Sequence, residues 1–287
     1  MRHGTMWRGV DVTLAMCPLC SDDEDIELVR NLEGGRRLVR HRCGYAWEHG
    51  EPDGPKKQRP RAFDDLRARF PKAEDVEPDV LERADRLKER YLATRPGFDP
   101  EVAAYWEKYQ RIFSPDGLRT CDPRLLKDFA NSDVGAHPGN QSVFNAAWNS
   151  MGDAAAAEST RRTIEHLLHG PDDVPCEDRL QELLDGTKSF AMTGFKEALL
   201  TRVLCVTQPG RFLSILKYTT EAGGKREIAR KVYGLELPAP ESVNWTLGRL
   251  IFWSNDLLYT LVGAGFANQQ HSAAFLWWAK DQLDESS

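Results

Sequence analysis

Three cysteines near the start of the chain have the residue type and spacing of a zinc site. Cys17 and Cys20 form a Cys-x-x-Cys pair, and Cys43 follows later in the same stretch. A tight turn that presents two thiolates supplies half of the tetrahedral nitrogen and sulfur set that Zn²⁺ prefers. Gly44, directly after Cys43, permits a second tight turn. With six cysteines in 287 residues, this spacing favours a metal site over a framework of disulfides.

The fourth ligand is expected to be an imidazole. His41 lies two residues before Cys43, and His49 lies six residues after it. His41 is preferred because it falls at the end of an expected strand, and His49 stays open as the alternative. The pattern resembles a zinc ribbon, although Arg40 stands where that family has the first cysteine of its second pair. The resulting prediction is a Zn²⁺ ion held by Cys17, Cys20, His41 and Cys43.

A structural role for this zinc is favoured over a catalytic one. Catalytic zinc keeps an open coordination position beside a general base, and Glu48 is the candidate base that this stretch offers. The expected module, residues 13–52, has too few apolar residues to fold without the ion. The alternative is a degenerate ribbon that no longer holds metal.

Two runs with strand character flank a turn inside this module. Residues 26–32 and 36–40 are separated by Glu33-Gly34-Gly35, and a Gly-Gly turn between such runs indicates a β-hairpin. Residues 53–62 are rich in proline, glycine and charge, and are predicted to form a linker.

Basic residues gather around the hairpin and the linker. The whole chain has a net charge of −6, yet residues 36–61 hold eight basic side chains against three acidic ones. Such a patch can neutralise phosphates, so we expect nucleic-acid contact here. The alternative is a solvated surface that pairs with the acidic run 22–25. The basic residues are Arg36, Arg37, Arg40, Arg42, Lys56, Lys57, Arg59 and Arg61.

The rest of the chain has helical periodicity. Apolar residues such as Val80, Ala84 and Leu87 recur at spacings of three and four, and strand patterns are scarce. The sequence therefore predicts a mainly α protein with a small N-terminal zinc ribbon. Two helical subdomains are expected, 63–153 and 154–287, which can also form one continuous body.

A turn near the middle of the second helical part resembles the helix-hairpin-helix pattern. Phe190 to Leu204 contains Gly194 between apolar residues, and an amphipathic helix follows. The resemblance implies that backbone N–H groups at this turn meet a phosphate. Lys196 stands where that family has a second glycine and is itself a candidate phosphate contact. An ordinary helix start is the alternative.

A second basic cluster follows this turn and is a further candidate for backbone contact. Tyr218 and Tyr233 flank it and offer rings for base stacking. The alternative is a surface helix that its tyrosines anchor to the core. The basic residues are Lys217, Lys225, Arg226, Arg230 and Lys231.

Short pieces of residues 160–280 resemble a helical region of McrB-type restriction proteins and related defence ATPases. They include Thr193-Gly194-Phe195, Gln208-Pro209-Gly210 and Ser254-Asn255-Asp256. The resemblance implies a role beside nucleic-acid-processing machinery and assigns no reaction. Residues 222–226 lack the pattern of a phosphate loop, so the ATPase itself is not expected in this chain.

No catalytic constellation is evident. His166 and His169 share a helical spacing without a third ligand, and the polar loop that begins at His137 is at most a pocket wall. The stretch 247–266 is interrupted by charged and polar residues, so no membrane span is expected. Residues 1–16 lack the apolar core and the small-residue cleavage site of a secretory signal, so a cytoplasmic location is expected.

Together these features predict a zinc-containing, nucleic-acid-binding accessory protein of restriction-modification or antiviral defence. DNA is expected as the ligand rather than RNA, and an ATPase or nuclease as the partner protein. Two alternatives stay open: a protein–protein adaptor in a multi-component system, and an enzyme with an unrecognised site around residues 137–148 or 165–169.

Overall fold

The computed structural model describes residues 26–32, 37–41, 46–49, 70–95, 97 and 99–284. The chain divides into two compact units, Met1–Arg61 and Ala62–Ser287. It is mainly helical with a small antiparallel sheet at the N-terminus, which confirms the predicted fold class. Five predicted site residues lie outside the described residues: Cys17, Cys20, Arg36, Arg42 and Cys43.

The N-terminal unit contains an antiparallel sheet in the order β1-β2-β3. The pairing of β1 (Ile26–Asn31) with β2 (Arg37–His41) confirms the predicted hairpin. A further strand, β3 (Ala46–His49), pairs with the other edge of β2 and was not predicted. Val39 of β2 is 3% exposed and lies opposite one residue of each neighbouring strand.

The larger unit is built from helices, and several of them begin at a proline that follows a capping residue. The side chain of Asp99 accepts a hydrogen bond from the Glu101 amide at the start of α3, and Ser114 caps α4 in the same way. Such caps satisfy amides that the first helical turn leaves without a partner. The helices are α2 (Pro78–Thr94), α3 (Pro100–Ile112), α4 (Pro115–Thr120), α5 (Pro123–Asn131), α6 (Ser142–Met151), α7 (Asp153–His169), α8 (Cys176–Asp185), α9 (Glu197–Thr207), α10 (Lys225–Tyr233), α11 (Leu247–Val262) and α12 (Gln269–Asp284), with short 3-10 turns at Ala73–Asp75 and Pro240–Ser242.

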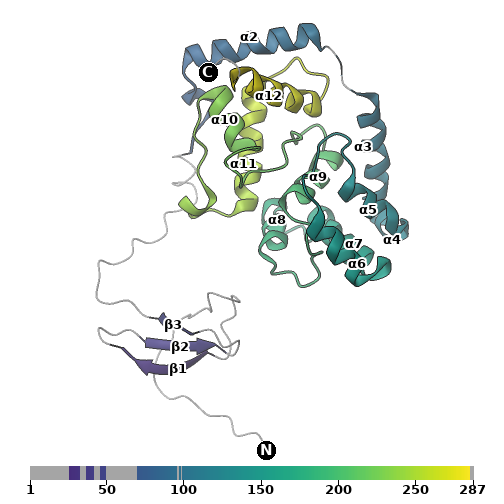
Figure 1. Ribbon diagram of the computed structural model, residues 1–287, viewed down its shortest axis with the longest axis vertical. Coiled ribbons are helices and arrows are strands. Elements are labelled where there is room, and N and C mark those ends of the chain that lie inside the picture. The colour runs from purple at the N-terminus through teal and green to yellow at the C-terminus, as the bar shows by residue number, and fades with distance from the viewer. Residues whose placement is uncertain are drawn as a thin grey trace, which may run out of the picture. The chain divides into compact units, whose positions relative to one another are not determined.

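These helices share one continuous hydrophobic core that extends from Phe70 to Ala279. Figure 1 shows α2 lying with α10, α11 and α12, so helices from both ends of this unit pack together. Helices α3 to α9 form the other part, and α8 packs on α11 where the two parts meet. Within the described residues, no helix combines the length and the apolar character needed to cross a bilayer.

Helix α9 lies in the interior, because every residue from Glu197 to Val206 is buried. Arg202 of this helix is 1% exposed. Its guanidinium donates hydrogen bonds to three backbone carbonyls, at distances of 3.0 Å to Phe129 and 2.9 Å to Val134, and also to that of Ser132. A buried cation is tolerated only when such acceptors surround it. Arg202 therefore fixes the end of α5 and the loop that follows.

We predict that Arg202→Met lowers the free energy of unfolding by about 3–5 kcal/mol, because buried carbonyl groups lose their donor. Urea denaturation of the full chain measures this. Arg230→Met is the matched control, since Arg230 is exposed on α10 and its replacement is expected to change the stability by less than about 0.5 kcal/mol. Equal effects of the two substitutions would contradict the structural role of Arg202.

Candidate functional site

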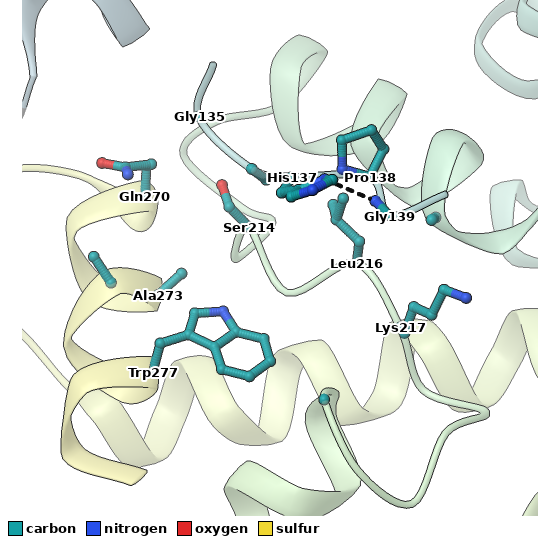
Figure 2. A pocket seen from close by; sticks show the side chains of 14 residues that line it. Gly135, His137, Pro138, Gly139, Ser214, Leu216, Lys217, Gln270, Ala273 and Trp277 are labelled. Atoms are coloured by element: carbon teal, nitrogen blue, oxygen red, sulfur yellow. Dashed lines mark hydrogen bonds between the residues drawn. The ribbon is translucent and has the colours of Figure 1, made fainter. Parts of the chain in front are cut away.

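A pocket of about 360 Å³ lies in the helical unit where three distant segments meet. Its size falls within the range of about 300–1,000 Å³ that is typical of small-ligand sites. The segments are the loop after α5, the stretch from the end of α9 to α10, and the first half of α12 (Figure 2). The lining residues are Gly135, Ala136, His137, Pro138, Gly139, Ala198, Ser214, Leu216, Lys217, Gly223, Gln270, Ala273, Ala274 and Trp277.

One wall of the pocket is a single face of α12. Gln270, Ala273, Ala274 and Trp277 follow the helical spacing i, i+3, i+4 and i+7, so they lie together on that face. Figure 2 shows the indole of Trp277 below the small side chain of Ala273, with Gln270 above it. The Lys280 ammonium lies 5.2 Å from the centroid of the Trp277 ring. This wall therefore combines an aromatic surface with an amide and with space left by two alanines.

The second wall is the stretch before α10. Ser214 and Leu216 are buried, and Lys217 is partly exposed. In Figure 2, Lys217 lies at the end of the pocket opposite Gln270. The hydroxyl of Ser214 lies between these ends, and Ala198 of α9 completes this side.

The third wall is the loop after α5, with His137 exposed at the mouth of the pocket. Its Nδ1 accepts a hydrogen bond of 3.0 Å from the amide of Gly139 and lies 3.5 Å from a carboxylate oxygen of Asp133. The predicted role of this loop as a pocket wall is confirmed for His137. Asn140 and Asn145 do not line the pocket, and Asn145 exchanges amide hydrogen bonds with Asn131.

Buried carboxylates fix the loop that joins the second wall to α10. Glu197 of α9 accepts hydrogen bonds from the amides of Tyr218 and Thr219 and from the Thr219 hydroxyl. Glu227 of α10 accepts one of 2.6 Å from the Gly223 amide. The loop therefore has a defined conformation without any ligand, which lowers the entropy cost of binding.

Lys225 joins the two ends of the same loop, and its side chain lies inside the protein. Its amide donates to the carbonyl of Lys217 at 2.8 Å, and its Nζ donates to the carbonyl of Ile251 at 2.8 Å. The side chain is 0% exposed, and burial lowers its pKa from 10.5 to about 8. The prediction that Lys225 contacts a phosphate is therefore corrected, because its ammonium does not reach the surface.

Two more residues of the predicted second basic cluster have acidic partners within the protein. Lys231 pairs with Glu227 at 2.8 Å and with Asp284 at 2.6 Å, and Arg226 lies 4.0 Å from Glu221. The tyrosines that flank the cluster, Tyr218 and Tyr233, are both buried. They therefore anchor this region to the core and do not present their rings to a base. Arg230 is exposed on α10.

The turn that resembles a helix-hairpin-helix also has an internal explanation. Gly194 has φ +81°, and a Cβ atom placed on it would lie 2.4 Å from the Phe144 amide nitrogen. The Nζ of Lys196 donates to the carbonyls of Leu183 and Leu184, each at 3.2 Å. The absence of a side chain at Gly194 therefore allows the turn to pack closely against α6. Lys196 caps carbonyl groups at the end of α8. These contacts give both residues a role within the fold, and a phosphate contact at this turn stays a prediction.

The two helical histidines have separate partners and form no joint site. His166 Nε2 lies 2.7 Å from Glu182 Oε2, and His169 Nε2 lies 2.8 Å from the carbonyl of Phe113. Within the described part of the chain, no group of three or more histidine, cysteine or acidic side chains is placed to hold a metal ion. The pocket is therefore the candidate site of the helical unit.

The described strands carry both basic and acidic residues. Arg40 is exposed and lies opposite Glu27 of β1, while Glu48 of β3 is exposed opposite Leu38. Arg37 is half-buried on β2. These strands hold three arginines and two glutamates, so their own excess of positive charge is small.

Comparison of the chain with protein-family models, with curated protein sequences and with solved structures gives no match. The interpretation of the pocket therefore depends on its own geometry. Sequence reasoning named His137 and Lys217, and it did not name Trp277 or Gln270 as site residues. The spacing of a glutamine, two alanines and a tryptophan on one face of α12 is visible in the sequence and identifies that wall.

We predict that Lys225→Met stabilises the protein at pH 7, by on the order of 2 kcal/mol, because an ammonium with a depressed folded-state pKa opposes folding. Between pH 8 and 10.5 the unfolded chain binds the proton that the folded wild type has released, so the stability of the wild type rises with pH relative to the variant. Denaturation of both proteins at pH 7 and pH 9.5 measures this. A constant difference between them would contradict the buried ammonium.

Proposed function

We propose that the chain is a zinc-containing, nucleic-acid-binding accessory protein, and that its N-terminal unit makes the nucleic-acid contacts. The observation that carries this proposal is the uneven distribution of charge. Residues 36–61 hold eight basic side chains against three acidic ones, whereas residues 62–287 hold 27 basic and 34 acidic ones. Phosphates are attracted to the first segment and repelled, on balance, by the second.

The contacts within the helical unit support this assignment. Three of its basic residues that the sequence grouped as phosphate contacts are instead held by internal partners, namely Lys196, Lys225 and Lys231. Arg37 and Arg40 of β2 are at least partly exposed. The phosphate contacts are therefore assigned to Arg36, Arg37, Arg40 and Arg42 with the basic linker.

The size of the sheet supports a structural zinc. The sheet has three short strands, and Val39 of β2 is buried between its neighbours. Units of this size commonly need a metal ion to fold. The proposed ligands are Cys17, Cys20, Cys43 and a histidine, either His41 or His49.

The place of this protein in restriction or antiviral defence is supported by the sequence resemblance of residues 160–280 to McrB-type proteins. On this proposal the ligand is DNA, and an ATPase or nuclease acts as the partner protein. The helical unit would then position that partner or hold a ligand of its own.

A second candidate function is that of a protein–protein adaptor. Helix α6 exposes two large apolar side chains, since Val143 is 62% exposed and Met151 is 44% exposed. Exposed apolar residues that gather on one surface favour protein contacts. Co-purification of a partner that Val143→Asp/Met151→Asp releases, without any effect on nucleic-acid binding, would favour the adaptor.

We predict that the purified chain contains about one Zn²⁺ ion, and that Cys17→Ser/Cys20→Ser loses it because two thiolate ligands are removed. Elemental analysis measures the ion. Separate His41→Ala and His49→Ala variants identify the fourth ligand, since the variant of the true ligand binds zinc more weakly. Wild-type protein without metal would contradict the zinc proposal.

We predict that Arg37→Glu/Arg40→Glu weakens binding to duplex DNA by at least about tenfold at low salt, because two phosphate contacts become repulsive. Fluorescence anisotropy over a salt series measures the affinity, and the slope against salt concentration becomes shallower in the variant. Arg83→Glu, an exposed change on α2, is the control. Affinity that is independent of salt, or equal losses in the variant and the control, would contradict an electrostatic interface in the N-terminal unit.

A further inference from the structure

We propose that the pocket between α12 and the two loops binds a planar heterocycle that carries an anionic group, the chemistry of a mononucleotide. This inference goes beyond the proposed function, because it concerns the helical unit alone. It requires neither zinc nor the basic residues of the N-terminal unit.

The aromatic wall favours a flat ligand. Trp277 is partly buried and lines the pocket beside Ala273 and Ala274, whose short side chains leave space next to the indole. A heterocycle that stacks on an indole gains about 1–3 kcal/mol. The volume of about 360 Å³ accommodates a ligand larger than a single ring system.

Two polar side chains are available to recognise the edge of a heterocycle. The amide of Gln270 offers both a donor and an acceptor, and the hydroxyl of Ser214 can act as either. Neither side chain makes a hydrogen bond to the part of the chain that the structure describes. Ser214 is buried, so a ligand that reaches it is shielded from water there.

The opposite end of the pocket is suited to an anion. Figure 2 shows Lys217 at the end away from Gln270, with its side chain directed outward, so it would meet an anion at the outer rim of that end. Its ammonium forms no ion pair with the described residues, in contrast to Lys231 and Lys280 of the neighbouring helices. A lysine acts as a point charge for phosphate. The ligand would therefore place its ring near α12 and its phosphate near Lys217.

The protein holds the walls of the pocket in place by burying charge. Arg202 fixes the carbonyls of Phe129 and Val134 ahead of the His137 loop, and Glu197 fixes the amides that follow Lys217. Burial of a charged group is costly unless its hydrogen bonds are satisfied. Two such groups thus support the loops that line one pocket, which is how a binding site is preorganised.

The test is a titration of the full chain, followed by Trp fluorescence and calorimetry, with each of the four ribonucleoside monophosphates. Saturable binding of at least one of them is expected. Trp277→Leu and Gln270→Ala should each weaken it at least tenfold. Lys217→Glu should weaken the nucleotide at least tenfold and the matching nucleoside less than threefold. Circular dichroism confirms that the variants fold, and the exposed Arg83→Glu is the control.

Two further experiments distinguish a free mononucleotide from a nucleotide within a strand. A single-stranded oligonucleotide that competes with the monophosphate, and loses affinity in Trp277→Leu, would identify an unpaired nucleotide of a strand as the ligand. The absence of such competition would identify a free mononucleotide. Arg37→Glu/Arg40→Glu should keep its affinity for the monophosphate, so a failure of the proposed function does not affect this test.

Two results would overturn the proposal. One is the absence of saturable binding of any monophosphate at millimolar concentration. The other is displacement of the bound nucleotide by inorganic phosphate at an equal concentration. That result would show that the pocket binds an anion and does not recognise the ring.

Discussion

The helical unit depends on the burial of two opposite charges on one interior helix. Glu197 and Arg202 lie on α9, where every residue from 197 to 206 is buried. Each charge requires hydrogen-bond partners. Arg202 finds them in backbone carbonyls at the end of α5 and in the loop after it, and Glu197 finds them in two loop amides and the Thr219 hydroxyl. The cost of an unpaired buried charge exceeds that of ordering a few loop residues, so these loops must adopt the conformations that satisfy α9.

The consequence is a defined pocket at the surface above this helix. The loop after α5 places His137 at the mouth of the pocket, and the loop before α10 places Lys217 at one end of it. Helix α12 supplies Gln270 and Trp277. Irregular segments normally move more than the helices around them. Here the backbone atoms of both loops are bonded to the interior, so side chains from distant parts of the sequence are kept in a constant arrangement. That constancy is the physical basis for recognition of a ligand.

The sequence predicted those features that depend on local pattern. Helical periodicity and the Gly-Gly turn were sufficient for the helical body and the β1–β2 hairpin, because both rest on neighbouring residues. Lys225 of the second basic cluster was misjudged because burial is a property of the tertiary structure: it looks like a surface residue in the sequence and lies in the core. Gly194 likewise suggested a phosphate site, whereas its lack of a side chain serves contact with α6. Trp277 and Gln270 became candidates only when the fold brought them beside Lys217.

The most direct measurement of the central claim is hydrogen exchange of the Glu197→Gln variant. A glutamine has one acceptor oxygen in place of two and carries no charge, so the hydrogen bonds to the loop are weakened. We expect the amides of Tyr218 and Thr219 to exchange about tenfold faster, as the loss of about 1.5 kcal/mol implies, while those of α11 keep their protection. Unchanged exchange at both amides would show that the carboxylate on α9 does not hold the loop, and the account of the pocket would fail.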